Sequence, residues 1–223
     1  MVKVLTLVGD NGGCELWRTY QPMAELQRQG YRSVQWGSRD DASLADIAHL
    51  FDAIVIQRLH WQGLPSGAAS HWINSLHRMG VAVIYEIDDD LFTNDFVRRM
   101  VELKGETPEF SEGRRRAVIE AVQLCDAMTV SSQRVATIAR QYTDRPVKVV
   151  PNYIDLRWWK MIQKQAERKV SGLTIGWAGG NRLDNDMVIM VEAWARIAKR
   201  RSLPLLSKVI TPKLFMTTFQ TSG

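Results

Sequence analysis

Three consecutive carboxylates, Asp88, Asp89 and Asp90, directly follow the apolar run Val81–Ile87. Negative charges at adjacent positions repel one another, and an arrangement with that cost is typical of a functional site. Asp88 and Asp89 are therefore the candidate catalytic residues, either as a base or as groups that orient a substrate hydroxyl. Two alternatives stay open: the triplet could hold a metal ion, or it could cap and solvate the next helix.

Other polar groups follow two further apolar runs. Arg58 and His60 come just after Ala53–Gln57, and a glycine-rich loop, 9–13, comes just after Val2–Val8. Glycines let the backbone approach a ligand closely, and open α/β sheets bind ligands at the carboxyl ends of their strands. His60 could act as an acid or base, although a lone histidine is more often structural or merely exposed. The loop lacks the spacing of a dinucleotide fingerprint.

A parallel sheet is expected to position these groups. Apolar runs of strand length alternate with segments of helical periodicity over the first 150 residues, which predicts an α/β protein. The expected fold is a Rossmann-like parallel sheet with helices on both faces. The predicted strands are Val2–Val8, Ser33–Trp36, Ala53–Gln57, Val81–Ile87, Ala127–Val130 and Val147–Val150.

The clearest βαβ unit spans 126–155. Ser131 or Ser132 offers a hydroxyl for capping the helix between its two strands, and Pro151 ends the second strand because it has no N–H. The helix carries an apolar stripe made of Val135, Ile138, Ala139 and Tyr142. Parallel strands need such a crossover, so this unit supports the predicted sheet.

Two segments are less regular. Pro22 cannot lie inside a regular helix without loss of a hydrogen bond, so we place it in the first turn of a helix that ends near Gly30. Further along, Gly105–Gly113 is polar and predicts a loop, with the next helix spanning Arg114–Leu124.

Four phrases of the sequence, in order, resemble GT-B glycosyltransferases of the GT4-like group. Gly12, Gly13, Arg18, Pro22 and Leu26 match the opening of the N-terminal domain in that family. The stretches 85–92 (YEIDDDLF) and 149–155 (VVPNYID) match a later phrase and the end of that domain. The stretch 174–180 (TIGWAGG) resembles the first βα unit of the domain that binds the sugar nucleotide. The resemblance covers about residues 1 to 195.

The resemblance implies transfer of a sugar from a nucleotide-diphosphate sugar to an unknown acceptor held by the N-terminal domain. The implied acceptor-side residues are Gly12, Gly13, Arg18, Arg58, His60 and Asn152, and the implied donor-side residues are Gly179, Gly180 and Arg182. No metal or cofactor is expected, because the Asp-x-Asp metal motif belongs to GT-A enzymes, which have a different fold. Better-known relatives carry a histidine near the aspartate triplet, which leaves the general base open.

The expected organisation is an N-terminal domain at 1–155, a linker at 156–170 and the first βα unit of a C-terminal domain at 171–223. No acidic residue follows Glu192, so the glutamate motif of the family for the donor ribose is missing. We therefore expect a truncated chain. The alternative to a transferase is a catalytically incompetent chain or an acceptor-binding partner subunit. The incomplete C-terminal unit could also form a homodimer.

Composition fits a soluble α/β protein. The net charge of +5 and the pI near 9.4 suit anionic ligands or an anionic membrane surface, while the scattered basic residues argue against nucleic acid as a partner. The two cysteines are too few for a disulfide framework and fit a reducing, cytoplasmic setting. No apolar stretch is long enough to span a membrane, so any contact at the inner membrane face would be peripheral.

Overall fold

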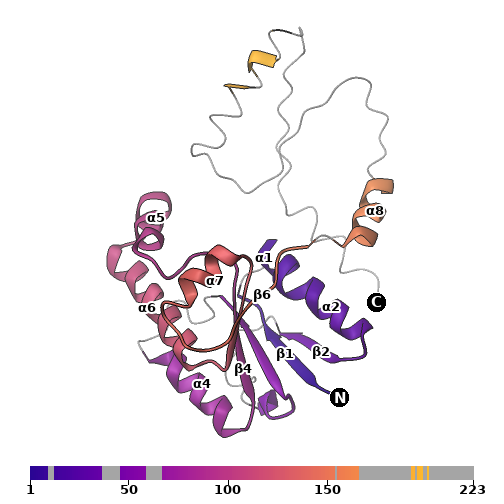
Figure 1. The fold of residues 1–223 in the computed structure, drawn as a ribbon, viewed down its shortest axis with the longest axis vertical. Helices are drawn as coiled ribbons and strands as arrows, with labels where there is room; N and C mark the ends of the chain where they lie inside the picture. Colours follow the sequence, from indigo (N-terminus) through magenta and orange to yellow (C-terminus); the bar gives the residue numbers. More distant parts are fainter. Residues whose placement is uncertain are drawn as a thin grey trace. The chain divides into compact units, whose positions relative to one another are not determined.

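The computed structural model describes residues 1–9, 13–36, 46–58, 67–153 and 155–165, together with 192–193, 195–197 and 200. The chain divides into two units, Met1–Glu167 and Arg168–Gly223, and nearly all of the described residues belong to the first (Figure 1). The predicted donor-side strand and glycine loop at 173–181 lie outside the described residues.

Six parallel strands form one sheet in the first unit, in the order β2-β1-β3-β4-β5-β6. Their bounds are β1 Lys3–Leu7, β2 Arg32–Trp36, β3 Ala53–Gln57, β4 Ala82–Ile87, β5 Ala127–Val130 and β6 Val147–Val149. All five pairings between neighbours are parallel. The six predicted strands and the Rossmann-like α/β class are confirmed by this sheet.

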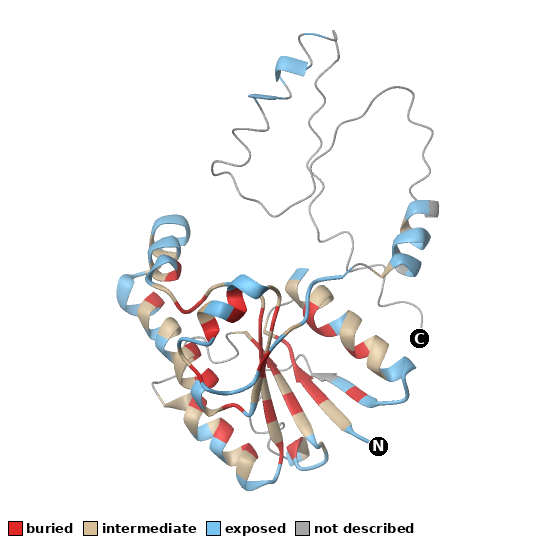
Figure 2. Ribbon diagram, viewed as in Figure 1, coloured by how far each residue is buried: buried red, intermediate tan, exposed pale blue. Residues whose placement is uncertain are grey.

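One face of the sheet carries most of the apolar core. Every second residue of the strands points to it, and its members include Leu5, Ile54, Tyr85 and Met128, all fully buried (Figure 2). Helices α4 (Ala68–Arg78), α6 (Pro108–Leu124) and α7 (Gln133–Ala139) contribute their buried side chains to the same core. The helical residues 46–48 add Ala48.

The opposite face carries buried polar residues. Thr6, Gln57 and Glu86 are all nearly inaccessible to solvent there. A continuous helical stretch from Gly13 to Arg28 covers this face, and the Thr6 hydroxyl donates to the Met23 sulfur at 3.1 Å. Helices therefore lie on both faces, as predicted.

The prediction made for Pro22 is confirmed for α2 (Gln21–Arg28), where the proline lies in the first turn and the helix ends near Gly30. Helical structure nevertheless begins earlier than predicted, because α1 (Gly13–Glu15) and the π-helical η1 (Leu16–Tyr20) directly precede α2. In a regular α-helix the ring of Pro22 would meet the carbonyl of residue 18. The wider π turn lies directly before it, and the Gln21 N–H donates to the Leu16 carbonyl, five residues back.

The predicted loop at Gly105–Gly113 is wrong. Helix α5 (Asn94–Lys104) ends at Gly105, whose φ of 67° suits glycine, and α6 already begins at Pro108. The Thr107 hydroxyl caps α6 by accepting from the Phe110 N–H at 3.2 Å. The segment 114–116 consequently lies inside α6, where its arginines pair with glutamates of the same region instead of opening a helix.

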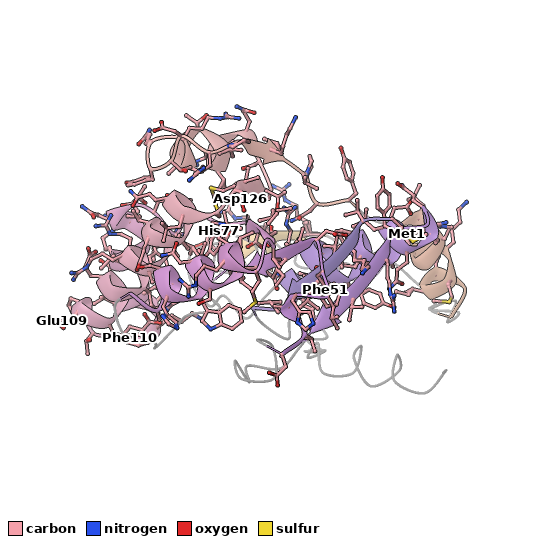
Figure 3. The ribbon with its side chains drawn as sticks, turned by 90° about the horizontal axis from the view of Figure 1, so that it is seen from below. Met1, Phe51, His77, Glu109, Phe110 and Asp126 are labelled. Carbon is pink, nitrogen blue, oxygen red and sulfur yellow. The ribbon has the colours of Figure 1, made fainter. Side chains whose placement is uncertain are left out.

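The amino-terminal edge of the sheet holds a structural pair and none of the candidate site residues. Figure 3 shows His77, at the end of α4, beside Asp126, which precedes β5. The His77 Nε2 lies 3.0 Å from an Asp126 carboxylate oxygen that also accepts from the Val83 N–H at 2.7 Å.

Helix α8 (Leu156–Gln165) follows β6 in the segment that was predicted as a linker. No helix in the described residues is long and apolar enough to cross a membrane.

Candidate functional site

The candidate site is built around the point where the strand order reverses. β1 has β2 on one side and β3 on the other, and open α/β sheets bind ligands outside the carboxyl ends of strands at such a point. Gly9 lies there after β1, and its N–H donates to Gln57 Oε1 at 3.0 Å. A Cβ atom on Gly9 would overlap the Gln57 carbonyl oxygen, so this position requires glycine. Gly9 is the first residue of the predicted glycine-rich loop, in which only Gly12 and Gly13 were candidate site residues.

Arg58, which follows β3, has a left-handed backbone. Its φ of 53° is positive, and no other non-glycine residue in the described part of the chain shares that property. Its N–H donates to the Glu86 carbonyl at 2.7 Å, and its carbonyl accepts a hydrogen bond from the Tyr85 hydroxyl. Burial raises the pKa of Tyr85, so this hydroxyl stays a donor. Contacts from β4 thus hold a backbone conformation that carries strain, a feature common at functional sites.

The Arg58 guanidinium forms ion pairs with both candidate catalytic carboxylates. Its Nε lies 2.9 Å from Asp88 Oδ1, an ion pair without the alignment of a hydrogen bond, and its Nη2 pairs with Asp89. A third contact runs from Nη1 to the Cys14 sulfur at 3.1 Å. The Asp88 side chain is 11% exposed and that of Asp89 is 56% exposed, so Asp89 is the carboxylate that a ligand can reach.

Asp90 is turned away from this pair. Its carboxylate accepts from the N–H groups of Phe92 and Thr93 at 3.1 and 3.2 Å, and from the Thr93 hydroxyl at 2.8 Å. Asp90 therefore orders the turn that leads into α5. It does not cap the helix, because Phe92 and Thr93 precede the first helical residue, Asn94. Within the described ranges, no group of three or more His, Cys, Asp and Glu side chains is placed to hold a metal ion.

A second ion pair lies buried beneath the first. Arg18, in η1, places its Nε 2.6 Å from Glu86 Oε1, and each side chain is only 2% exposed. Arg18 Nη1 donates to the Val150 carbonyl and, at 3.0 Å, to Asn152 Oδ1. Protein groups thus enclose the guanidinium of Arg18, the residue that the family resemblance assigns to the acceptor side. Asn152 is likewise engaged by Arg18.

Glu86 is a buried acid that the sequence analysis did not single out. Burial raises its pKa to about 7, although the Arg18 charge and hydrogen bond oppose the shift; Asp88 adds to it and Arg58 reduces it. Its Oε2 is buried without a hydrogen-bond partner among the described residues, as is the Nε2 of Gln57, its neighbour in register on β3. The sequence did contain a signal for Glu86, because it is a charged residue inside the apolar run 81–87.

The structure thus brings Arg18, Arg58, Asp88, Asp89 and Asn152 to one edge of the sheet. Gly13 begins α1 beside Cys14, which contacts Arg58. The remaining candidate residues, Gly12, His60, Gly179, Gly180 and Arg182, lie outside the described residues.

Two guanidiniums face three carboxylates in this network. With Glu86 ionised the five groups carry one net negative charge, and with Glu86 protonated they are neutral. A pKa of about 7 for Glu86 places this change near neutral pH. The reachable member, Asp89, can accept a hydrogen bond or a proton from a hydroxyl.

Comparison with known proteins adds little to this description. No family model matches the chain, and no curated protein sequence does either. Among solved structures, the chain is similar to a phosphoglycerate oxidoreductase from Vibrio cholerae with 14% identity and a TM-score of 0.28. The alignment covers 74% of this chain and 60% of that one. The assignment to the Rossmann-like α/β class therefore rests on the parallel sheet itself.

Proposed function

We propose that this chain is a glycosyltransferase of the GT-B type and that its first unit binds the acceptor. The observation that carries the proposal is the half-exposed Asp89, which follows β4 and is held by Arg58 at the end of β3, the strand beside the reversal point. The ordered sequence phrases, above all VVPNYID at 149–155, support the same assignment.

In the proposed reaction, the acceptor hydroxyl oxygen attacks the anomeric carbon of a nucleotide-diphosphate sugar. A glycosidic bond forms while the bond from that carbon to the diphosphate oxygen breaks, and Asp89 takes the hydroxyl proton. Asp88 keeps Arg58 in place, and its own carbonyl accepts from the Ser131 hydroxyl at 2.6 Å. Backbone N–H groups at Gly179 and Gly180, with Arg182, are the proposed stabilisers of the leaving diphosphate.

The test is a panel of UDP- and GDP-sugars, with hydrolysis and transfer followed by nucleotide release and donor binding followed by calorimetry. Asp89→Asn is expected to reduce turnover by roughly 10²- to 10⁴-fold, the range for loss of a general base. Asp90→Asn is the matched control, because an amide oxygen can still accept from Phe92 and Thr93. Its turnover should stay close to that of the unmodified chain.

Well-folded protein that binds no donor would contradict the transferase proposal. The second candidate, a non-catalytic acceptor-binding subunit, is favoured by one observation: Asp88 and Asp89 both already pair with Arg58. In that case acceptor saccharides should bind in the absence of any donor, and Asp89→Asn should weaken this binding.

A further inference from the structure

Several large apolar side chains of helix α8, and one just before it, are exposed to solvent. Tyr153, Leu156, Trp159 and Met161 each keep between 47% and 72% of their surface exposed. Single exposed apolar residues are ordinary, but Leu156 and Trp159 lie three positions apart on one face of α8 and form an apolar patch of the kind that often marks an interaction surface. The patch lies far along the chain from the carboxylates at 88–89 and serves no part of the proposed reaction.

Apolar and basic side chains share one face of α8, which we call the outward face. Leu156, Trp159, Lys160 and Gln163 have the spacing i, i+3, i+4, i+7 of a single helix face, and all four are exposed. Away from this face, Arg157 pairs with Asp155 at 3.2 Å and lies 3.7 Å from Glu25 of α2, and Ile162 is half-buried.

The charges of α8 are of one sign. Its ten residues include three basic residues and no acidic residue. Arg157 is engaged by Asp155 and Glu25, whereas Lys160 is exposed on the outward face, directly beside Trp159. An indole with an adjacent lysine suits the boundary between lipid headgroups and acyl chains, where the ring is half-immersed and the ammonium group meets phosphates.

We propose that α8 docks the first unit on an anionic lipid surface, with Leu156 and Trp159 inserted among the lipids and Lys160 on their phosphates. At about 1.5 Å per residue, its ten residues span about 15 Å, half of the roughly 30 Å hydrocarbon core. The helix therefore lies in the interface and does not cross it. This proposal is independent of the proposed transferase reaction.

Vesicle flotation of the full chain tests the proposal. We expect binding to vesicles of phosphatidylcholine mixed with phosphatidylglycerol, and little binding to phosphatidylcholine alone. Leu156→Ser and Lys160→Glu should each weaken partitioning by on the order of tenfold, through lost insertion and reversed charge. Leu103→Ser and Lys104→Glu on α5, also exposed, are the matched controls and should bind like the unmodified chain.

Three results would overturn lipid docking. The first is equal binding to neutral and anionic vesicles, and the second is equal binding by the α8 variants and their α5 controls. The third is an absence of vesicle binding together with a concentration-dependent dimer, seen by light scattering, that Leu156→Ser dissociates; the patch would then join two copies of the chain. Circular dichroism of each variant verifies that a loss of binding does not come from unfolding.

Discussion

Replacement of Glu86 by glutamine should change how stability depends on pH. In the folded state, burial raises the pKa of Glu86 to about 7 from an ordinary value of 4.5. Between these two values the folded protein holds a proton that the unfolded chain has released. The contribution of Glu86 is therefore fully present below about pH 4.5 and is lost as the pH rises through about 7.

The expected magnitude follows from the same numbers. A difference of about 2.5 between the two pKa values, at about 1.4 kcal/mol for each pH unit, amounts to about 3 kcal/mol. Glu86→Gln cannot titrate, so urea unfolding of both proteins from pH 4.5 to pH 8 should show the free energy of unfolding of the unmodified chain falling by about 3 kcal/mol relative to the variant. Because Glu86→Gln also removes the carboxylate beside Arg18, the free energy of unfolding of the variant is shifted by a constant amount at every pH. This shift does not change how the difference between the two proteins depends on pH.

Glu112→Gln supplies a control without a slope in this pH range. The hydrogen bond from Arg115 lowers the pKa of Glu112 below its ordinary value of 4.5, so its small contribution is fully present from pH 4.5 to pH 8 and is lost only at lower pH. The curve of this variant should therefore run parallel to that of the unmodified chain. Parallel curves for the unmodified chain and Glu86→Gln would refute the reasoning. So would a gap that grows in favour of the unmodified chain as the pH rises, because that would mean the Arg18 pairing outweighs burial.

Three further substitutions test the packing of the site in urea unfolding. Gly9→Ala should cost about 1–3 kcal/mol, because the added Cβ overlaps the Gln57 carbonyl, and an unchanged midpoint would contradict that close approach. Arg18→Met should cost about 3–5 kcal/mol by leaving Glu86 buried without its partner, and Glu86→Gln in the same chain should recover part of the loss. Thr107→Ala should cost about 1 kcal/mol if its hydroxyl caps α6, whereas Thr107→Ser should cost little.

The strands could be predicted from the sequence because a parallel sheet is covered on both faces. Its strands read as short, nearly continuous apolar runs, and those runs ended within a residue or so of β3, β4 and β5. Helix starts were harder where local chemistry was overlooked. Thr107 followed by Pro108 is a capping signal, but the polar composition around it suggested a loop. The π turn before Pro22 has no comparable signature, since it depends on how the chain accommodates the proline.

The site was predictable only in part, for a related reason. Residues that directly follow apolar runs gather at one sheet edge, so Arg58, Asp88 and Asp89 could be placed together without knowledge of the strand order. Pairings across the fold could not be inferred in this way. Arg18 and Glu86 are 68 positions apart, and their contact requires both the order of the strands and the face that η1 covers.

The Arg18 guanidinium links the candidate site to the end of the sheet. It joins Glu86 on β4 to the Val150 carbonyl and to Asn152. These two residues lie 132 and 134 positions after Arg18 in the sequence. The N–H of Val150 also donates to the Val130 carbonyl at 2.8 Å, so the exit from β6 is fixed from two sides. The charge of Asp88 raises the pKa of Glu86, and the charge of Arg58 lowers it. Protonation of Glu86 near neutral pH therefore alters the charge that opposes Arg18 and the charge beside Asp88 at once. The buried pair is thus coupled electrostatically to Asp88 and Arg58, and Arg58 is the partner of the exposed carboxylate of Asp89.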